Sequence, residues 1–546
     1  MNVLKINNIL IFLKLIVEGK MKKISELNLG FSDAQNYARR DNKKMFNDIF
    51  VKNYFLEKLI NPNIYFLIGE KGTGKTAYSV YLKNNNYREN KTVLSYISAT
   101  DYDKFYNIKK QKNLELTDFV GIWKVILLLL LSKNITDDDK VVSIFNKSNL
   151  DNLVKAIDEY YLNAFTPEII TALRIVDETE LAAKLICKYS EISGKNGTTL
   201  EFTETRFQMN LFYIEKQFSD AIRNLKLNKN VNLFIDGIDI RPNVIPYDDY
   251  IQCIRGLADA CWALNTELFQ NVKDSKGHLK IVLLLRPDIY SALNLQNATN
   301  KLRDNAVFLD WRTTYKEYKT SNLYKVSKRI LEYQQEKIEE DDLWEKYLPW
   351  TFPTTNQSRE FDTAFMEFIR ISLSRPRDIV VILKILQEHM LKNGKEDEIE
   401  FSKDIYQSDD FQNAYSEYFM SSLKDQLSFY YSVDDFNHFI KFFDYFKDSN
   451  FKYEEYSAVY EKFTDYILGN ADDIPEFVDD PKKFLQLLYD SNVIAAIEDN
   501  GDANTYYHFS YREKSISNIE PKVPIDKNIS YKFHYGLYKR AKFGRF

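Results

Sequence analysis

The segment that most constrains the fold of this 546-residue chain is Gly69–Thr76 (GEKGTGKT). It directly follows the apolar run Asn63–Ile68 (NIYFLI) and leads into AYSVYL, whose apolar residues have helical spacing. The pattern G-x-x-x-x-G-K-T between a strand and a helix is typical of phosphate-binding loops, because its glycines let main-chain N–H groups surround phosphate oxygens. The following helix adds the positive end of its dipole. A nucleotide site is therefore predicted here, and a purely structural glycine turn is the alternative.

The polar groups of this loop have distinct expected roles. Lys75 would reach the β- and γ-phosphate oxygens, and the hydroxyl of Thr76 would bind Mg²⁺. The main chain of the loop would supply the other phosphate contacts, at Gly69, Gly72, Thr73 and Gly74.

A second apolar run, Val231–Ile235 (VNLFI), ends in acidic residues. Asp236, at the carboxyl end of this predicted strand, would hold a water of the Mg²⁺ shell beside Thr76. Because Gly237 follows, Asp239 is the nearest spare carboxylate that could activate a water molecule. A turn at the end of the strand is the alternative for Asp236, and a role for Asp239 as the base is left open.

Three further apolar runs complete the pattern of a sheet: Thr92–Ile97, Leu279–Leu285 and Asn305–Leu309. Near-continuous apolar strands separated by helical stretches predict an α/β fold with a parallel sheet buried on both faces by helices. Polar residues at the carboxyl edge of such a sheet form the ligand crevice. No N/T-K-x-D motif for guanine follows the third strand, so ATP and Mg²⁺ are the expected cofactors.

Arginines outside the loop are further candidates for nucleotide contacts. Arg286 follows Leu279–Leu285 and would lie at the same sheet edge as Asp236, with a surface salt bridge as the alternative. Arg375 or Arg377, just before an apolar helix, could reach the phosphates across a domain crevice and couple hydrolysis to rotation of a lid. A capping or Asp-paired role for these two arginines is equally open.

Shifts in composition and the positions of prolines predict four parts of the chain. A segment rich in Lys, Glu and Tyr, 313–348, is expected to form one or two helices that leave the core, and Pro349–Pro353 then interrupts it. The four predicted parts are an N-terminal extension (1–35), a core (36–315) with a helical insertion at about 101–230, a helical lid (316–395) and a mostly helical C-terminal domain (396–546).

The C-terminal domain has a helix followed by two β-like runs, Asn492–Ile497 and Thr505–Tyr511, a pattern compatible with a winged helix. Its tail interleaves aromatic residues with basic ones, as segments that contact nucleic-acid phosphates do. These basic residues are Lys532, Lys539, Arg540, Lys542 and Arg545. A docked helix with a solvated basic face is the alternative, and the formal charge of −5 does not favour nucleic-acid binding.

Membrane insertion and disulfides are not expected. The apolar run Val125–Leu131 is predicted to lie in a core helix, and Lys5 and Lys14 break the apolar sequence of the first twenty residues. The three cysteines have no C-x-x-C spacing and are expected to be buried reduced thiols, as in a cytoplasmic protein. They are Cys187, Cys253 and Cys261.

The motifs GEKGTGKT, LFIDGID, LLLRPD and SRPRD, in this order, resemble those of bacterial P-loop ATPases of the STAND, KAP and ORC-like branch of AAA+ proteins. The resemblance covers about residues 50–395 and is nearest to the ATPases of bacterial defence islands. It implies a P-loop NTPase fold of the ASCE type, a helical lid and, as in ORC-like members, a winged helix after the lid.

The resemblance also implies a function. Such proteins are cytoplasmic, self-associating, nucleotide-loaded switches that assemble with or license a protein effector, here in antiphage defence. Arg286 would be the sensor of the γ-phosphate, and Arg303 would be an arginine finger that acts on a neighbouring copy. Members of this branch often have Glu directly after the first acid, where this chain has Gly237, so slow hydrolysis is expected. A DNA-stimulated initiator or translocase, a binding module without turnover and a small-molecule kinase are the alternatives.

Overall fold

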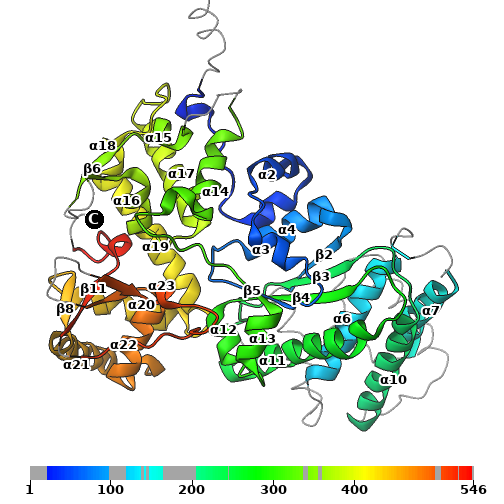
Figure 1. Ribbon diagram of the computed structural model, residues 1–546. Helices are drawn as coiled ribbons and strands as arrows, with labels where there is room; N and C mark the ends of the chain where they lie inside the picture. The colour runs from blue at the N-terminus through cyan, green and yellow to red at the C-terminus, as the bar shows by residue number, and fades with distance from the viewer. Residues whose placement is uncertain are drawn as a thin grey trace, which may run out of the picture. The chain divides into compact units, whose positions relative to one another are not determined.

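The computed structural model describes most of the chain (Figure 1). The described residues are 21–97, 119–136, 141–142, 147–163, 204–243, 245–335, 342–354, 360–498, 506–526 and 528–543. The chain forms two compact units. Unit 1 comprises Met1–Asn53, Lys71–Gly74 and Asp310–Phe546, and unit 2 comprises Tyr54–Glu70 and Lys75–Leu309. The four-part division expected from composition stays a prediction.

Unit 2 is built on a five-stranded parallel sheet with the strand order β2-β3-β4-β1-β5 (Figure 1). Every residue of β3 and β4 is buried, as expected for a sheet that helices cover on both faces. The strands are β1 (Phe66–Ile68), β2 (Lys91–Tyr96), β3 (Val231–Asp236), β4 (Leu279–Leu285) and β5 (Ala306–Phe308). The predicted α/β architecture, with a parallel sheet flanked by helices, is confirmed.

The strand order determines which residues meet at the carboxyl edge of the sheet. β4 lies between β1 and β3, with Ile68 paired to Leu285 and Ile235 paired to Leu283. Because the strands are parallel, the segments that follow β1, β3 and β4 all leave from one edge. The residue after β4, Arg286, therefore starts between the other two segments.

The helices of unit 2 include those that lie within the residues of the predicted insertion. Within about 101–230 the described segments are mainly helical, and residues 98–118, 137–140, 143–146 and 164–203 lie outside the described part of the chain. The α-helices of unit 2 are α3 (Tyr54–Leu59), α4 (Lys75–Asn85), α6 (Phe119–Thr136), α7 (Lys147–Asn163), α10 (Glu204–Arg223), α11 (Tyr247–Ala263), α12 (Pro287–Ala292) and α13 (Ala298–Asn305).

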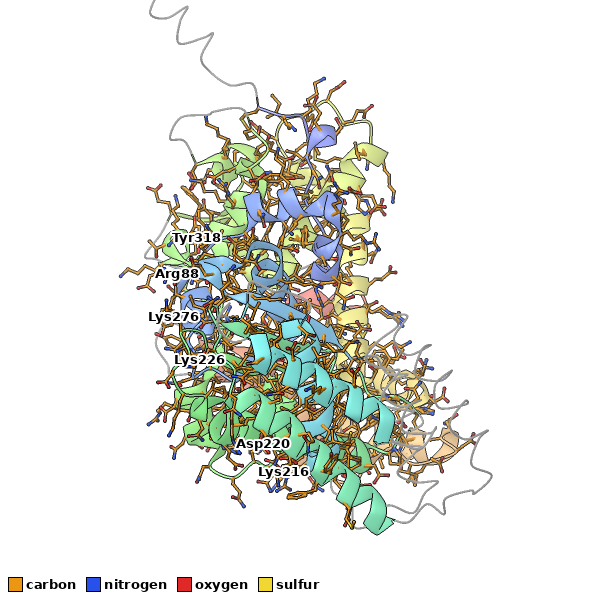
Figure 2. All side chains as sticks on the ribbon, turned by 90° about the vertical axis from the view of Figure 1, so that its right-hand side faces the viewer. Arg88, Lys216, Asp220, Lys226, Lys276 and Tyr318 are labelled. Carbon is orange, nitrogen blue, oxygen red and sulfur yellow. The ribbon has the colours of Figure 1, made fainter. Side chains whose placement is uncertain are left out.

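Helix α10 is amphipathic and packs against α6 and α7. Leu211, Ile214 and Phe218 are buried at helical spacing. Lys216 and Asp220, on the same helix, are exposed (Figure 2).

Among the described residues, α6 is the one helix that is long and apolar enough to cross a membrane by composition, with a mean hydropathy of 1.6 and 56% of the window buried. It packs against α10 and α11, and every residue of Val125–Leu131 is buried. The core helix predicted for this run is therefore confirmed. Cys253 and Cys261 are buried free thiols, as predicted, and Cys187 lies outside the described residues.

Unit 1 is mostly helical. Its α-helices are α2 (Lys43–Ile49), α14 (Asn322–Glu332), α15 (Leu343–Tyr347), α16 (Ala364–Ile371), α17 (Pro376–Lys392), α18 (Lys403–Tyr406), α19 (Asp409–Leu427), α20 (Val433–Phe439), α21 (Tyr453–Asn470), α22 (Pro481–Asp490) and α23 (Ser510–Glu513). A two-stranded antiparallel sheet joins β6 (Thr351–Pro353) to β7 (Phe361–Thr363). Residues 22–30 lie against α17, where Gln387 Nε2 donates to the carbonyl oxygens of Ile24 and Leu27.

A four-stranded antiparallel sheet, with the order β10-β9-β11-β8, completes unit 1. Its strands are β8 (Asn450–Lys452), β9 (Ile494–Glu498), β10 (Tyr506–Phe509) and β11 (Ile529–Phe533). The two β-like runs expected after α22 are confirmed as the antiparallel strands β9 and β10. The sheet also contains β8 and β11, and the winged-helix assignment stays a prediction.

The described part of the basic tail is docked. Leu537 and Ala541 are buried, while Lys539 Nζ lies 2.7 Å from an Asp409 carboxylate oxygen and Lys542 Nζ lies 3.4 Å from one of Asp444. The packing expected in the docked alternative is therefore observed, but the segment is the strand β11 followed by a 3-10 helix (Tyr535–Leu537) and turns rather than an α-helix with a solvated basic face. Arg545 lies outside the described residues.

Candidate functional site

The loop between β1 and α4 requires glycine at two positions. Gly72 has a φ of 89° and Gly74 a φ of 94°, in the left-handed region that other residues rarely adopt. A Cβ atom on Gly72 would also lie 3.3 Å from Cβ of Arg377. Helix α4 begins at Lys75, so the positive end of its dipole lies at the end of the loop.

Lys75 is folded over its own loop. Its Nζ donates to the carbonyl oxygens of Gly69 (2.7 Å) and Glu70 (3.3 Å), and the residue is 8% exposed. Burial lowers the pKa of Lys75, and the charges of Asp239 and Asp236 oppose this effect. The ammonium group therefore lies among acidic groups at the edge of the sheet.

Thr76 and Asp236 are in direct contact. Thr76 Oγ1 donates to Asp236 Oδ2 at 2.6 Å, and the main-chain N–H of Gly237 donates to Oδ1 at 2.9 Å. Burial raises the pKa of Asp236, an effect that the two hydrogen bonds oppose. The two residues predicted to share a magnesium ion are thus adjacent.

Asp239 lies close enough to this pair to act on it electrostatically. Its carboxylate is partly exposed, and its charge acts to raise the pKa values of Lys75 and Asp236. A partly hydrated carboxylate beside a buried lysine and a buried aspartate can accept a proton from water. Its role as a base stays a prediction.

Arg286 is buried rather than at the surface, with 1% of the residue exposed. Its Nε donates to Asp288 Oδ1 at 3.0 Å, and Nη2 donates to the other carboxylate oxygen of Asp288. Its positive charge acts to lower the pKa of Lys75, which places the guanidinium near the loop. The salt bridge that was the alternative for Arg286 is therefore present, but it is buried and not at the surface.

Arg375 directly precedes α17 and is 5% exposed. Its Nε and Nη2 donate to the two carboxylate oxygens of Asp378 at 2.9 and 2.7 Å, and Nη1 donates to the carbonyl oxygen of Lys71 at 2.8 Å. The Asp-paired alternative is the arrangement observed. A contact between Arg375 and a phosphate stays a prediction.

Arg377 and Arg303 are placed differently from Arg375. Arg377, in the first turn of α17, donates from Nε to the carbonyl oxygen of Ser32 at 3.0 Å. Arg303 is exposed on α13, just before β5. Neither position tests the predicted contact with a phosphate.

Sequence reasoning assigned no role to Trp311 and Tyr418. Trp311 Nε1 donates to the carbonyl oxygen of Thr73 at 2.8 Å, and Tyr418 donates from its hydroxyl to Asp378 Oδ1 at 2.8 Å. The position of Trp311, three residues after β5 at the carboxyl edge of the sheet, was the one signal that could have identified it.

The residues present fit a magnesium–nucleotide complex. In the described ranges there is no group of three or more His, Cys, Asp or Glu side chains that could hold a metal ion by themselves. Mg²⁺ bound with a nucleotide does not require such a group, because phosphate oxygens and water complete its shell. One hydroxyl, from Thr76, and one carboxylate, from Asp236, are the protein groups it would need.

Comparisons of the chain with protein-family models, with curated proteins and with solved structures give no match. Inferences about function therefore depend on the geometry described above.

Proposed function

We propose that the chain is an ATP-binding, slowly hydrolysing regulatory ATPase whose nucleotide site is the loop Gly69–Thr76. The observation that most supports this is the 2.6 Å hydrogen bond between Thr76 and Asp236, which are 160 positions apart. Each belongs to its own motif, and the two were predicted together as the protein groups of a magnesium site. Their contact at the carboxyl edge of a parallel sheet is the arrangement that the proposed chemistry requires.

The loop would bind the phosphates through main-chain N–H groups and the N-terminus of α4. Lys75, which now bonds the carbonyl oxygens of Gly69 and Glu70, would turn its ammonium group toward the β- and γ-phosphates. Thr76 and Asp236 would hold Mg²⁺, which supplies charge neutralisation at the phosphates. Burial of Asp236 strengthens these electrostatic interactions.

Asp239 is the proposed base, and Arg286 is the proposed sensor of the γ-phosphate. Arg286 follows β4, the strand between the one that precedes the loop and the one that ends in Asp236. Hydrolysis would be slow because Gly237 occupies the position directly after Asp236, which leaves the more distant and partly exposed Asp239 to orient the water. An imperfectly placed base loses much of the rate that general-base catalysis provides.

The slow turnover suits a switch rather than a metabolic enzyme, since a bound nucleotide would persist long enough to define a state. We propose that this P-loop NTPase of the ASCE type acts in the bacterial cytoplasm, self-associates and assembles with a protein effector in antiphage defence. The helical insertion is the proposed partner surface. On α10 it exposes the apolar side chains of Met209 and Phe212, which are 64% and 70% exposed.

Calorimetric titration of the full chain with ATP and Mg²⁺ tests the nucleotide site. We expect Lys75→Ala to weaken ATP binding by about tenfold or more, because a charge-assisted hydrogen bond to phosphate is lost. Lys83→Ala is the matched control, since Lys83 is an exposed lysine on the same helix. Equal affinities of the wild type and Lys75→Ala would contradict the proposal.

Phosphate release by the same proteins tests hydrolysis. Slow turnover that disappears in Asp236→Asn, with or without duplex DNA, is the expected result. Several-fold stimulation by DNA that is lost when residues 527–546 are removed would instead favour the DNA-dependent alternative. Turnover that is identical in wild type and Lys75→Ala would favour the alternative in which the chain is a binding module without catalysis.

A further inference from the structure

Buried donors from the C-terminal part of unit 1 hold the carbonyl groups of the loop. Arg375 Nη1 donates to Lys71 O, and Trp311 Nε1 donates to Thr73 O, each at 2.8 Å. Both donor residues are almost fully buried, with 5% and 7% exposed. A carbonyl group and the N–H group of the next residue share one planar peptide unit. A donor that fixes a loop carbonyl therefore also fixes the direction of the following N–H group.

The carbonyl between these two is held in the same way. Gly72 O accepts a hydrogen bond from the main-chain N–H of Arg377 at 3.4 Å. In a trans peptide the C=O and N–H bonds point in opposite directions. With three successive carbonyls directed at donors of unit 1, the N–H groups of Gly72, Thr73 and Gly74 are directed away from those donors. These are the N–H groups that a phosphate-binding loop uses.

Arg375 is itself rigidly held. Asp378 is 1% exposed and binds the guanidinium through both carboxylate oxygens, and it also accepts hydrogen bonds from the Tyr418 hydroxyl and the Leu373 main-chain N–H. A buried ion pair with its remaining lone pairs satisfied has a single geometry. By contrast, the ion pair between Lys71 and Asp425 includes a carboxylate side chain that is 62% exposed, so it constrains the loop little.

We propose that Arg375 is a positioning residue for the phosphate-binding loop. Paired with Asp378, it fixes the carbonyl of Lys71 and thereby holds the N–H of Gly72 in the direction that a nucleotide phosphate requires. This inference rests on the proposed ATP binding. In it, Arg375 acts on the phosphate indirectly, through the main chain of the loop. Because coupling is reciprocal, a nucleotide bound to this loop stabilises the start of α17.

A double variant that neutralises both partners, Arg375→Gln with Asp378→Asn, tests the proposal without leaving a buried unpaired charge. The matched control is Arg370→Gln with Asp362→Asn and Glu367→Gln, which neutralises an arginine of α16 together with both carboxylates that it binds. We expect the Arg375 double variant to raise the Kd for ATP about tenfold. The control should bind ATP as the wild type does, and the Arg375 double variant and the control should have similar melting temperatures.

Two further measurements do not depend on the folding of that double variant. Trp311→Phe removes the N–H donor to Thr73 O and keeps a smaller aromatic ring, and it should weaken ATP binding several-fold. In the wild-type chain, ATP should slow amide hydrogen exchange at residues 374–379, where α17 begins. Slower exchange there is the reciprocal effect that a merely structural ion pair would not produce.

The possible results separate this proposal from the proposed function. If the wild type binds ATP, but the Arg375 double variant binds it equally well and ATP does not protect residues 374–379, the positioning role is wrong and the nucleotide site stands. If the double variant does not fold, exchange in the wild type decides between the two outcomes. If the wild type and Lys75→Ala both fail to bind ATP, the proposed function and this inference fall together.

Discussion

At the scale of single residues, Gly237 accounts for the absence of a second acid directly after Asp236. Its φ is 91°, and a Cβ at this position would lie 2.3 Å from the carbonyl oxygen of Ile97. Any side chain here would require the main chain directly after β2 or β3 to move. The local packing therefore excludes a glutamate directly after Asp236, and Asp239 is the nearest carboxylate on the same segment.

We expect Gly237→Ala to lower the free energy of unfolding by more than the left-handed conformation alone would, about 2 kcal/mol or more. Gly394→Ala is the matched control, because Gly394 has a φ of 69° but no atom within 4 Å of its Cβ position. That substitution should cost only about 1 kcal/mol. Urea unfolding of the two variants measures the difference, and equal losses would contradict the steric explanation.

Lys280 makes the stability of unit 2 depend on pH. It is fully buried in β4, its Nζ donates to the carbonyl oxygens of Leu59 (2.6 Å) and Asn61 (2.8 Å), and burial lowers its pKa from 10.5 to about 7. Between these two values the unfolded chain binds more protons than the folded chain. The free energy of unfolding should therefore rise with pH through this window, with a slope that approaches about 1.4 kcal/mol per pH unit.

The variant Lys280→Met isolates this effect from the other groups that titrate in alkaline solution. The difference in unfolding free energy between the wild type and the variant should change in favour of the wild type as the pH rises above neutrality. Urea unfolding at a series of pH values measures this difference. A difference that stays constant with pH would show that Lys280 keeps its charge in the folded state.

At the scale of elements, the C-terminal segment is fixed to α19 by a buried neutral histidine. His534, directly after β11, is 0% exposed, its ring stacks on Phe419 with the centroids 4.6 Å apart, and its Nδ1 accepts a hydrogen bond from the Gly536 N–H. Burial, and secondarily the charge of Arg512, lowers the pKa of His534 from 6.5 to about 3. Protonation of the ring would therefore oppose this packing.

The unfolded chain binds a proton at His534 below pH 6.5, whereas the folded chain does so only near pH 3. The free energy of unfolding should consequently fall as the pH drops through this window. His534→Gln retains an acceptor for Gly536 but does not titrate, so its stability relative to the wild type should increase in acid. Thermal unfolding of both proteins across the window is the measurement, and parallel pH profiles would contradict the assignment.

The elements that could be predicted from the sequence are those whose signal is local. β3 and β4 form from near-continuous apolar runs, each with one polar residue, and the observed strands match them to within one residue. By contrast, β6 and β7 were missed, because Pro349–Pro353 was interpreted as an interruption although β6 lies within it. Proline lacks an N–H donor and is tolerated in strands mainly at edges, so a two-stranded sheet of this kind leaves a weak pattern.

The candidate site also has contacts that could be predicted from the sequence and contacts that could not. Thr76 and Asp236 could be predicted to meet because each belongs to a motif with a known place at the sheet edge. The bond from Arg375 to the carbonyl of Lys71 could not, since every residue has a carbonyl and the sequence does not indicate which one a guanidinium reaches. The pairing of Arg375 with Asp378, three residues away, was one of the roles that the sequence analysis left open for this arginine.

At the scale of the whole molecule, the proposed self-association gives Arg303 a testable role. Arg303 is exposed on α13, so it is available to a neighbouring copy. An arginine that acts in trans stabilises charge in the transition state and contributes little to ground-state binding. We therefore expect Arg303→Ala to lower ATP turnover by about a hundredfold or more with an unchanged Kd for ATP. Arg223→Ala, at an exposed arginine of α10, is the control.

Mixing two inactive variants gives the decisive measurement. Arg303→Ala retains an intact nucleotide site and Lys75→Ala retains an intact finger, so a mixed assembly contains sites in which an intact loop faces an intact Arg303. Turnover should therefore recover when the two proteins are combined in the presence of ATP, and the mass of the assembly should increase under the same conditions. If turnover by Arg303→Ala equals that of the wild type, or if mixing restores nothing while the assembly forms, Arg303 is not a finger that acts between copies.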